Sequence, residues 1–188
     1  MRNFALVVIS FLAFSCDTET NQELKSITIA ELAKATPEFS DFSRSLDTLG
    51  LSSTFEEAGD LTVFIPNNNA MGAAVNALGY ARLDSVFKYP TAKDSLRNIL
   101  RYHVLTSRVL STSLVNNQSV TSLYGQDFTV TIDPIAPADA TYPGESNKIT
   151  LTGSNTVIPT AATVIARDVK CSNGIVHPID AVLLPATF

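Results

Sequence analysis

The sequence predicts an α+β fold in which the helices come first and the strands follow. Helical spacing of apolar residues dominates the chain as far as His103. From Val104 onward, short runs rich in β-branched residues are separated by turn residues, which is typical of strands. One strand-like run, 61–65, lies among the helices, and the sequence has no internal repeat. Because helices and strands are segregated, an alternating β-α-β architecture is disfavoured.

Two amphipathic helices are predicted at the start of the domain. Ile29, Leu32 and Ala33 stand at i, i+3 and i+4, which indicates a short first helix. Thr36 is the predicted N-cap of the next helix, and Pro37 is its first residue. The apolar face of this helix consists of Phe39, Phe42, Leu46 and Leu49. Gly50 stands where the helix should end.

A buried strand and two more helices follow. The run 61–65 is bounded by Gly59-Asp60 and by Pro66, so it predicts a buried strand. The asparagines 67–69 offer an N-cap to a helix over 70–78, and Thr91 offers one to a helix over 91–101. Leu96, Ile99, Leu100 and His103 fall on one side of the latter helix. The stretch 80–90 indicates at most one or two further helical turns.

The second half of the chain predicts six strands: 118–123, 126–132, 149–151, 162–169, 175–179 and 182–184. Asn173 and Gly174 stand between two of these runs. Because both residues tolerate a positive φ, they predict a tight hairpin turn. Residues 133–147 contain three prolines and several acidic or small residues, and they predict a long exposed loop.

The first residues have the features of an export signal. Arg2 precedes a stretch from Phe4 to Phe14 that is apolar except for Ser10 and is too short to span a bilayer, which takes about 20 residues. Residues 12–16 resemble a relaxed bacterial lipobox, so Cys16 is the expected lipidation site. Residues 13–15 also suit ordinary secretion, and that alternative stays open. We expect a lipoprotein signal at 1–15, a tether at 16–25 and one domain at 26–188.

Composition narrows the classes of function. The net charge of −5 and the lack of a basic cluster argue against a nucleic-acid surface. The chain has two cysteines, Cys16 and Cys171. If Cys16 carries lipid, an intrachain disulfide is excluded, and Cys171 is expected to be a small buried apolar side chain.

Four segments together resemble the fasciclin domain family. These are the helical opening 28–49, the segment 61–71 with its strand, proline and asparagines, the segment 96–105 around Tyr102-His103, and the segment 163–185 with Asn-Gly, His, Ile-Asp and Leu-Leu-Pro. The resemblance covers about residues 26–186. It implies a fasciclin-like wedge-shaped β-sandwich with an N-terminal helical layer.

The chain departs from the family pattern in four places. Asn68 stands where threonine is usual and Met71 where phenylalanine is usual, and both changes are mild because Asn caps helices and Met fills core volume. Pro178 lies inside the last strand, where it must mark an edge or a bulge. The loop 133–147 is long, which leaves open whether a family binding surface near it is retained.

No arrangement of side chains in the sequence indicates catalysis. His177 with Asp180 would suit a base and its orienting partner, and His103 with His177 would suit two metal ligands. Buried, hydrogen-bonded structural histidines are the better interpretation of both. The same holds for Tyr102, although in some animal members of the family the Tyr-His segment takes part in adhesion. We therefore expect no enzyme, no catalytic residue, no cofactor and no metal.

Two functions remain after these exclusions. The first is a non-enzymatic adhesion or interaction module of the cell envelope, anchored by N-terminal lipidation, with an unidentified protein, matrix or polysaccharide partner. The expected location is the outer membrane, on its surface or periplasmic face, or the medium if Cys16 is not lipidated. The second is a ligand- or glycan-binding accessory lipoprotein of an uptake system, which predicts a concave pocket with polar groups and aromatic faces. Tyr80, Tyr89, Tyr124 and Tyr142 could supply such faces.

Overall fold

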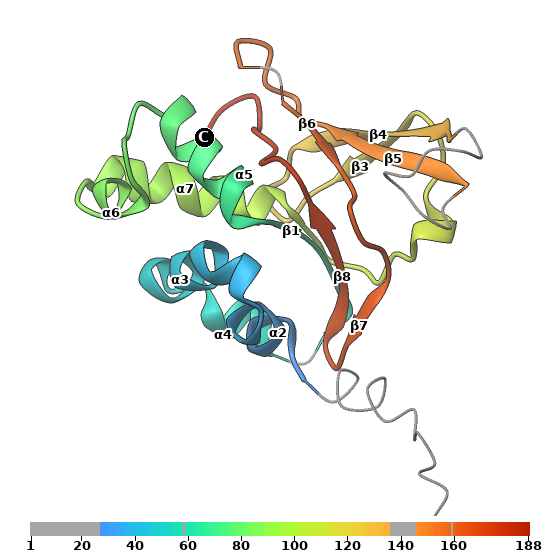
Figure 1. The fold of residues 1–188 in the computed structure, drawn as a ribbon, viewed down its shortest axis with the longest axis horizontal. Coiled ribbons are helices and arrows are strands. Elements are labelled where there is room, and N and C mark those ends of the chain that lie inside the picture. Colours follow the sequence, from blue (N-terminus) through green and yellow to red (C-terminus); the bar gives the residue numbers. More distant parts are fainter. Residues whose placement is uncertain (1–26, 58, 136–145, 159) are drawn as a thin grey trace, which may run out of the picture.

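The computed structural model describes residues 27–57, 59–135, 146–158 and 160–188. It shows a layer of helices against two four-stranded sheets (Figure 1), which confirms the predicted α+β class. The export signal, Cys16 and the tether lie outside the described residues. Within the described ranges, every helix is too short or too polar to cross a membrane.

The helices begin and end close to where the sequence predicts them. They are α2 Ile29–Ala35, α3 Ser40–Leu49, α4 Ser52–Glu56, α5 Asn68–Ala77, α6 Leu83–Val86 and α7 Pro90–Tyr102, with 3₁₀ turns η1 Pro37–Phe39 and η2 Ser111–Ser113. Gly50 ends α3 in the left-handed conformation, with φ of 68°, as its position predicts. Thr36 is the N-cap residue of η1 and Pro37 its first residue, as predicted, but the Thr36 hydroxyl donates to the Leu32 carbonyl (2.8 Å) instead of capping the turn. The predicted cap at Thr91 is wrong, because α7 starts at Pro90 and its N-cap is Tyr89.

The asparagines after β1 act at two helix starts. Asn67 caps α5, since its Oδ1 accepts from the Ala70 amide at 2.9 Å. Asn68 instead reaches the start of α3, where its Oδ1 accepts from Asp41 N (3.0 Å) and its Nδ2 donates to Pro37 O (2.9 Å). The Asn68 side chain therefore ties α5 to α3.

The strands form two sheets. One has the order β2-β1-β8-β7 and the other the order β3-β4-β5-β6. Their bounds are β1 Leu61–Pro66, β2 Val104–Leu105, β3 Gln118–Thr121, β4 Asp127–Pro134, β5 Asn147–Thr152, β6 Ala161–Thr163, β7 Val169–Cys171 and β8 Gly174–Ile179. The predicted strand 162–169 is thus divided between two sheets. The segment 182–184 is buried but is not a strand. A bridge between Val164 and Ile179 joins the sheets on one side.

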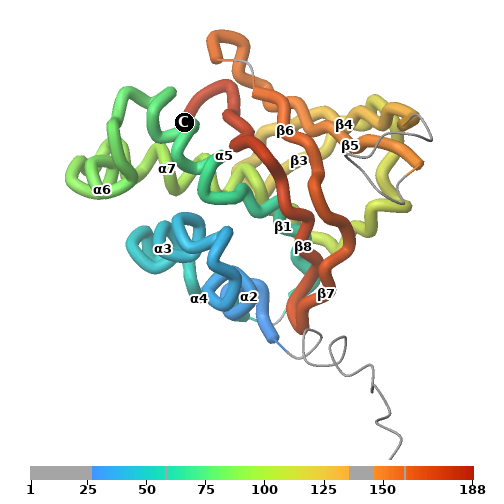
Figure 2. Tube along the Cα trace, viewed as in Figure 1, coloured from blue at the N-terminus to red at the C-terminus, as the bar shows by residue number. Residues whose placement is uncertain are grey.

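The last strand returns to the first. β8 pairs in parallel with β1, with Leu61 beside Gly174 and Pro66 beside Ile179, and Figure 2 shows the red end of the chain lying along β1. Pro178 lies beyond Val176, where the pairing of β8 with β7 ends. Its carbonyl accepts from Ile165 N at 2.8 Å. The prediction that Pro178 marks an edge is therefore confirmed on the side of β7, while the pairing of β8 with β1 continues past it.

Alternate residues of β1 face two separate cores. Val63 and Ile65 belong to the core between the helices and the first sheet, together with Val176 of β8. Phe64 belongs to the core between the sheets, where its ring meets that of Phe128 edge-on at 5.5 Å. Because both faces of β1 are buried, its sequence is a nearly continuous apolar run.

The hairpin between β7 and β8 differs from the prediction. Cys171 pairs with Gly174, so the turn residues are Ser172 and Asn173. The non-glycine residues with positive φ in the described part are Asn117 and Asp168, so Asn173 does not need one. Asn173 is buried, and its amide holds other segments: Oδ1 accepts from Ile29 N (2.9 Å), and Nδ2 donates to Phe55 O (2.8 Å) and Glu57 O (3.1 Å).

Gly174 is required for close approach rather than for its dihedral angles. A Cβ at this position would lie 2.2 Å from the Leu61 carbonyl oxygen and 2.9 Å from Cδ1 of Ile29. Its φ lies outside the positive range that favours glycine. Asn173 and Gly174 are thus required for contacts with distant segments, and not for their preference for turns.

Candidate functional site

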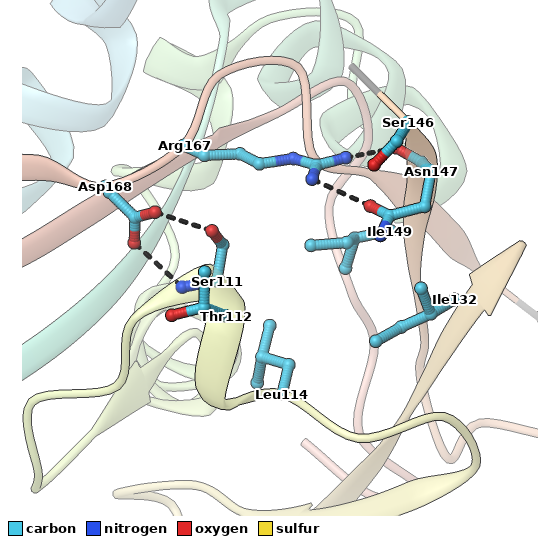
Figure 3. A pocket seen from close by; sticks show the side chains of 9 residues that line it. All are labelled: Ser111, Thr112, Leu114, Ile132, Ser146, Asn147, Ile149, Arg167 and Asp168. Atoms are coloured by element: carbon cyan, nitrogen blue, oxygen red, sulfur yellow. Dashed lines mark hydrogen bonds between the residues drawn. The ribbon is translucent and has the colours of Figure 1, made fainter. Parts of the chain in front are cut away.

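A polar cleft of about 510 Å³ opens where η2, the ends of β4 and β5, and the segment before β7 meet. Figure 3 shows its lining, an aliphatic floor with a polar rim. The floor consists of Leu114, Ile132 and Ile149, and the rim of Ser111, Thr112, Ser146, Asn147, Arg167 and Asp168. The volume lies within the usual range for small-molecule pockets. We call this hollow the polar cleft.

The charged groups of the polar cleft are held by neighbouring residues. The Asp168 carboxylate accepts from Ser111 N (2.8 Å) and from Ser111 Oγ (2.5 Å), as the dashed lines in Figure 3 show. The Arg167 guanidinium donates to Asn147 Oδ1 (2.8 Å) and to the Asn147 carbonyl. These bonds fix the rim of the polar cleft.

His177 lies beneath the rim and serves as a structural support. Its Nδ1 accepts from the Asp168 amide (3.2 Å), its Nε2 donates to the Val109 carbonyl (3.1 Å), and its ring stacks on Phe64 at 5.4 Å. Burial lowers the pKa of His177, so the ring is neutral at pH 7. Asp180 instead accepts from Thr163 N at 2.6 Å. His177 and Asp180 therefore do not form the pair of a base and its orienting carboxylate that the sequence suggested.

The residues Ser111, Asp168 and His177 do not form a hydrolytic triad. A nucleophilic serine must donate its hydroxyl proton to the imidazole, which in turn is oriented by a carboxylate. Here the Ser111 hydroxyl donates to Asp168, and the His177 ring receives the backbone amide of Asp168 while donating to Val109. The hydrogen bonds run in directions that fix the backbone rather than activate a nucleophile.

His103 and Tyr102 face inward, as the sequence predicts. His103 is fully buried, with Nδ1 donating to Ile99 O (2.7 Å) and Nε2 accepting from Leu183 N (2.9 Å). Burial lowers its pKa to about 4. The Tyr102 hydroxyl donates to Asp127 O (2.6 Å) and accepts from Ser154 N (3.0 Å). Both side chains join the last helix to later segments of the chain.

The two cysteines and a possible metal site remain to be placed. Cys171 is buried, and burial raises the pKa of its thiol to about 11, which confirms an unreactive core residue. Cys16 lies outside the described residues, as does most of the loop 133–147. In the part of the chain that the structure describes, no three His, Cys, Asp or Glu side chains gather closely enough to hold a metal ion.

Sequence reasoning missed the polar cleft. Ser111 and Asp168 are 57 positions apart, and Asn147 and Arg167 are 20 positions apart. No motif links the members of either pair, since each pair meets only after the two sheets have packed. The positive φ of Asp168, 55°, is also set by this packing.

Comparison with known proteins gives a consistent result. The model of the fasciclin domain matches residues 37–185. The chain is 30% identical over 160 residues to Protein sll1483 of Synechocystis sp., covering 85% of this chain and 74% of that protein. It is also 27% identical to human Stabilin-1 over 161 residues, which is 85% of this chain but 5% of Stabilin-1.

A solved structure shares the fold. It contains a FAS1 domain pair from the insect cell adhesion molecule Fasciclin I, and it aligns with a TM-score of 0.62 at 17% identity. The alignment covers 85% of this chain and 51% of that one, so this chain spans about half the length of the domain pair.

Proposed function

The chain belongs to the fasciclin domain family, and on that premise we propose that it is an adhesion module held in a bacterial cell envelope by a lipid on Cys16. Fasciclin domains are non-catalytic binding modules. The observation that carries the proposal is the family match over residues 37–185, because it includes η1, β8 and every element between them. The binding site for a partner therefore lies on the surface of the domain.

The loop between β5 and β6 supports a role in contact. Val157 is 87% exposed, and Figure 1 shows the orange loop after β5 projecting from the sheets. Asn155 fixes its backbone, with Oδ1 accepting from Val157 N (3.0 Å) and Ile158 N (2.7 Å). The Asn155 Nδ2 donates to Pro185 O at 2.9 Å. An exposed apolar side chain on a fixed backbone loses little entropy when a partner covers it.

The sequence of the first sixteen residues supports the anchor. The apolar stretch is signal-like, and Cys16 follows the small residue Ser15. One acyl chain anchors a protein weakly, whereas two or more anchor it stably. The tether 16–25 would then separate the membrane surface from a domain whose first described residue is Ile27. The proposed location is the outer membrane, on its surface or periplasmic face.

Two measurements test the proposal. The full chain is expressed in a Gram-negative host beside Cys16→Ala, and both are followed by membrane fractionation and by protease accessibility on intact cells. The anchor predicts membrane retention that is lost in Cys16→Ala, so retention of that variant refutes it. Adhesion predicts that cells displaying the full chain bind immobilised matrix or polysaccharide coats better than cells with an empty vector. Equal binding contradicts the adhesion function.

The alternative function, capture of a small ligand for an uptake system, is favoured by the polar cleft. Its volume and its aliphatic floor suit a small polar molecule. However, its rim groups are already hydrogen-bonded to one another, so a ligand must compete with those bonds. Thr112→Tyr, which would fill the opening, should abolish uptake but leave adhesion intact if this alternative holds.

A further inference from the structure

A second, smaller hollow lies on the helical layer, over α6. Its volume is about 410 Å³, and it is lined by Gly79, Tyr80, Ala81, Ser85, Tyr89 and Thr91. We call it the tyrosine hollow. The rings of Tyr80 and Tyr89 lie 6.0 Å apart between centroids and are inclined by 33°. Figure 1 shows α6 at the end of the helical layer far from β4 and β5, so the tyrosine hollow and the polar cleft are separate.

Short-range hydrogen bonds fix the backbone at the two tyrosines. Gly79 adopts φ of 84°, and the next amide, Tyr80 N, donates to Val75 O at 3.0 Å. On the other side, Tyr89 N donates to Val86 O (3.3 Å), and Pro90 begins α7 with its restricted φ. The backbone at both tyrosines is therefore fixed before any ligand arrives, which lowers the entropy lost on binding.

The side-chain hydroxyls of the tyrosine hollow have no hydrogen-bond partners in the described part of the chain. The hydroxyls of Tyr80, Ser85, Tyr89 and Thr91 take part in none of its hydrogen bonds, and no lining residue carries a formal charge. Tyr89 is 53% exposed, so much of its ring is open to solvent. Tyr80 is partly buried against the helical core and Tyr89 is more exposed, so the hollow offers aromatic ring surface together with four neutral hydroxyls.

From this lining we propose that the tyrosine hollow binds one or two residues of a neutral polysaccharide chain. The C–H face of a pyranose ring is apolar and carries slight positive charge, so it packs on the electron-rich face of tyrosine. Sugar hydroxyls both donate and accept hydrogen bonds, as do the four hydroxyls of the hollow. The inference rests on the adhesion function proposed above and names the class of its partner.

Two other ligand classes fit the lining less well. A proline-rich peptide also packs on tyrosines, but its carbonyls only accept, and proline has no N–H to donate. Such a peptide would therefore offer few donors to the oxygen atoms of the four hydroxyls, which can accept hydrogen bonds as well as donate them. An acidic polysaccharide would require a cation within the hollow, and the lining contains none. A neutral saccharide uses both the rings and the hydroxyls.

The test uses the full chain in a detergent that has no sugar head group. The chain contains no Trp, so its fluorescence comes from its five tyrosines and reports on ligands that cover them. Neutral tetrasaccharides of glucose, mannose and galactose are titrated, with saturation-transfer NMR as a second readout. Tyr89→Ala should weaken binding about tenfold. Tyr89→Phe, which keeps the ring, should weaken it less, and Thr112→Ala in the polar cleft should not change it.

Three results would overturn the inference: no tetrasaccharide binds the wild type, Tyr89→Ala binds as well as wild type, or a proline-rich peptide alone binds in a Tyr89-dependent way. Unfolding of Tyr89→Ala should match that of wild type, because the Tyr89 side chain makes no capping bond in α7. Adhesion of cells to polysaccharide coats separates the two proposals. If wild type does not adhere, the adhesion function fails. If Tyr89→Ala adheres as well as wild type, only the site fails.

Discussion

Replacing Asn173 by alanine should cost about 3 kcal/mol of unfolding free energy. The change removes the acceptor of the Ile29 amide and the donor to the carbonyls of Phe55 and Glu57. Ile29 is fully buried and Phe55 is 1% exposed, so water cannot replace the partners that these two residues lose. Each buried group left without a partner costs about 1–3 kcal/mol. For a domain of this size the expected fall in Tm is about 6–12 °C.

Urea unfolding followed by circular dichroism measures this loss, and a second variant, Asn173→Gly, separates two explanations for it. If Asn173 served a turn with positive φ, Asn173→Gly would be tolerated. If its amide holds the segments together, Asn173→Gly should destabilise at least as much as Asn173→Ala. Asn116→Ala is the matched control, because the Asn116 side chain also accepts from a backbone amide, Ile132 N, but in an exposed position. Equal losses in Asn116→Ala and Asn173→Ala would refute the reasoning.

Two other predictions concern the core. Gly174→Ala should destabilise the fold by about 2 kcal/mol or more, because the new Cβ would lie 2.2 Å from the Leu61 carbonyl oxygen. Gly72→Ala is the control: it has open space in α5 and should stabilise the fold slightly. Thermal unfolding of both variants measures the difference. The pKa of His103 falls from 6.5 in the unfolded chain to about 4 in the fold, so the unfolded state binds more protons between these values. Stability should therefore be complete above pH 6.5 and fall by about 2 kcal/mol from pH 7.5 to 5 in urea titrations, and a flat profile would contradict a buried neutral ring.

Local patterns predicted most of the helices and strands. The spacing of Phe42, Leu46 and Leu49, with Gly50 after them, indicates α3 because the helix buries a single face and then stops. The run 61–65 indicates β1 because both of its faces are buried. In these segments tertiary packing stabilises the same conformation that the local sequence favours.

The errors occur where distant segments decide the outcome. Asn173 and Gly174 have the composition of a turn, yet their positions are set by Ile29, Phe55 and Leu61. The parallel pairing of β1 with β8 and the meeting of Ser111 with Asp168 leave no local periodicity to detect. The tyrosine hollow lies in the stretch 80–90, where α6 has four residues and is too short to show a helical repeat.

The pairing of residue 61 with residue 174 also determines when the domain can become stable. Until the last part of the chain has been synthesised, β1 has only the two residues of β2 beside it, and the Ile29 amide lacks its Asn173 acceptor. Such non-local contacts slow folding, because a long loop must close before they form. A chain that has been made only as far as residue 173 therefore lacks the longest ladder of the first sheet, and one edge of β1 is left unpaired.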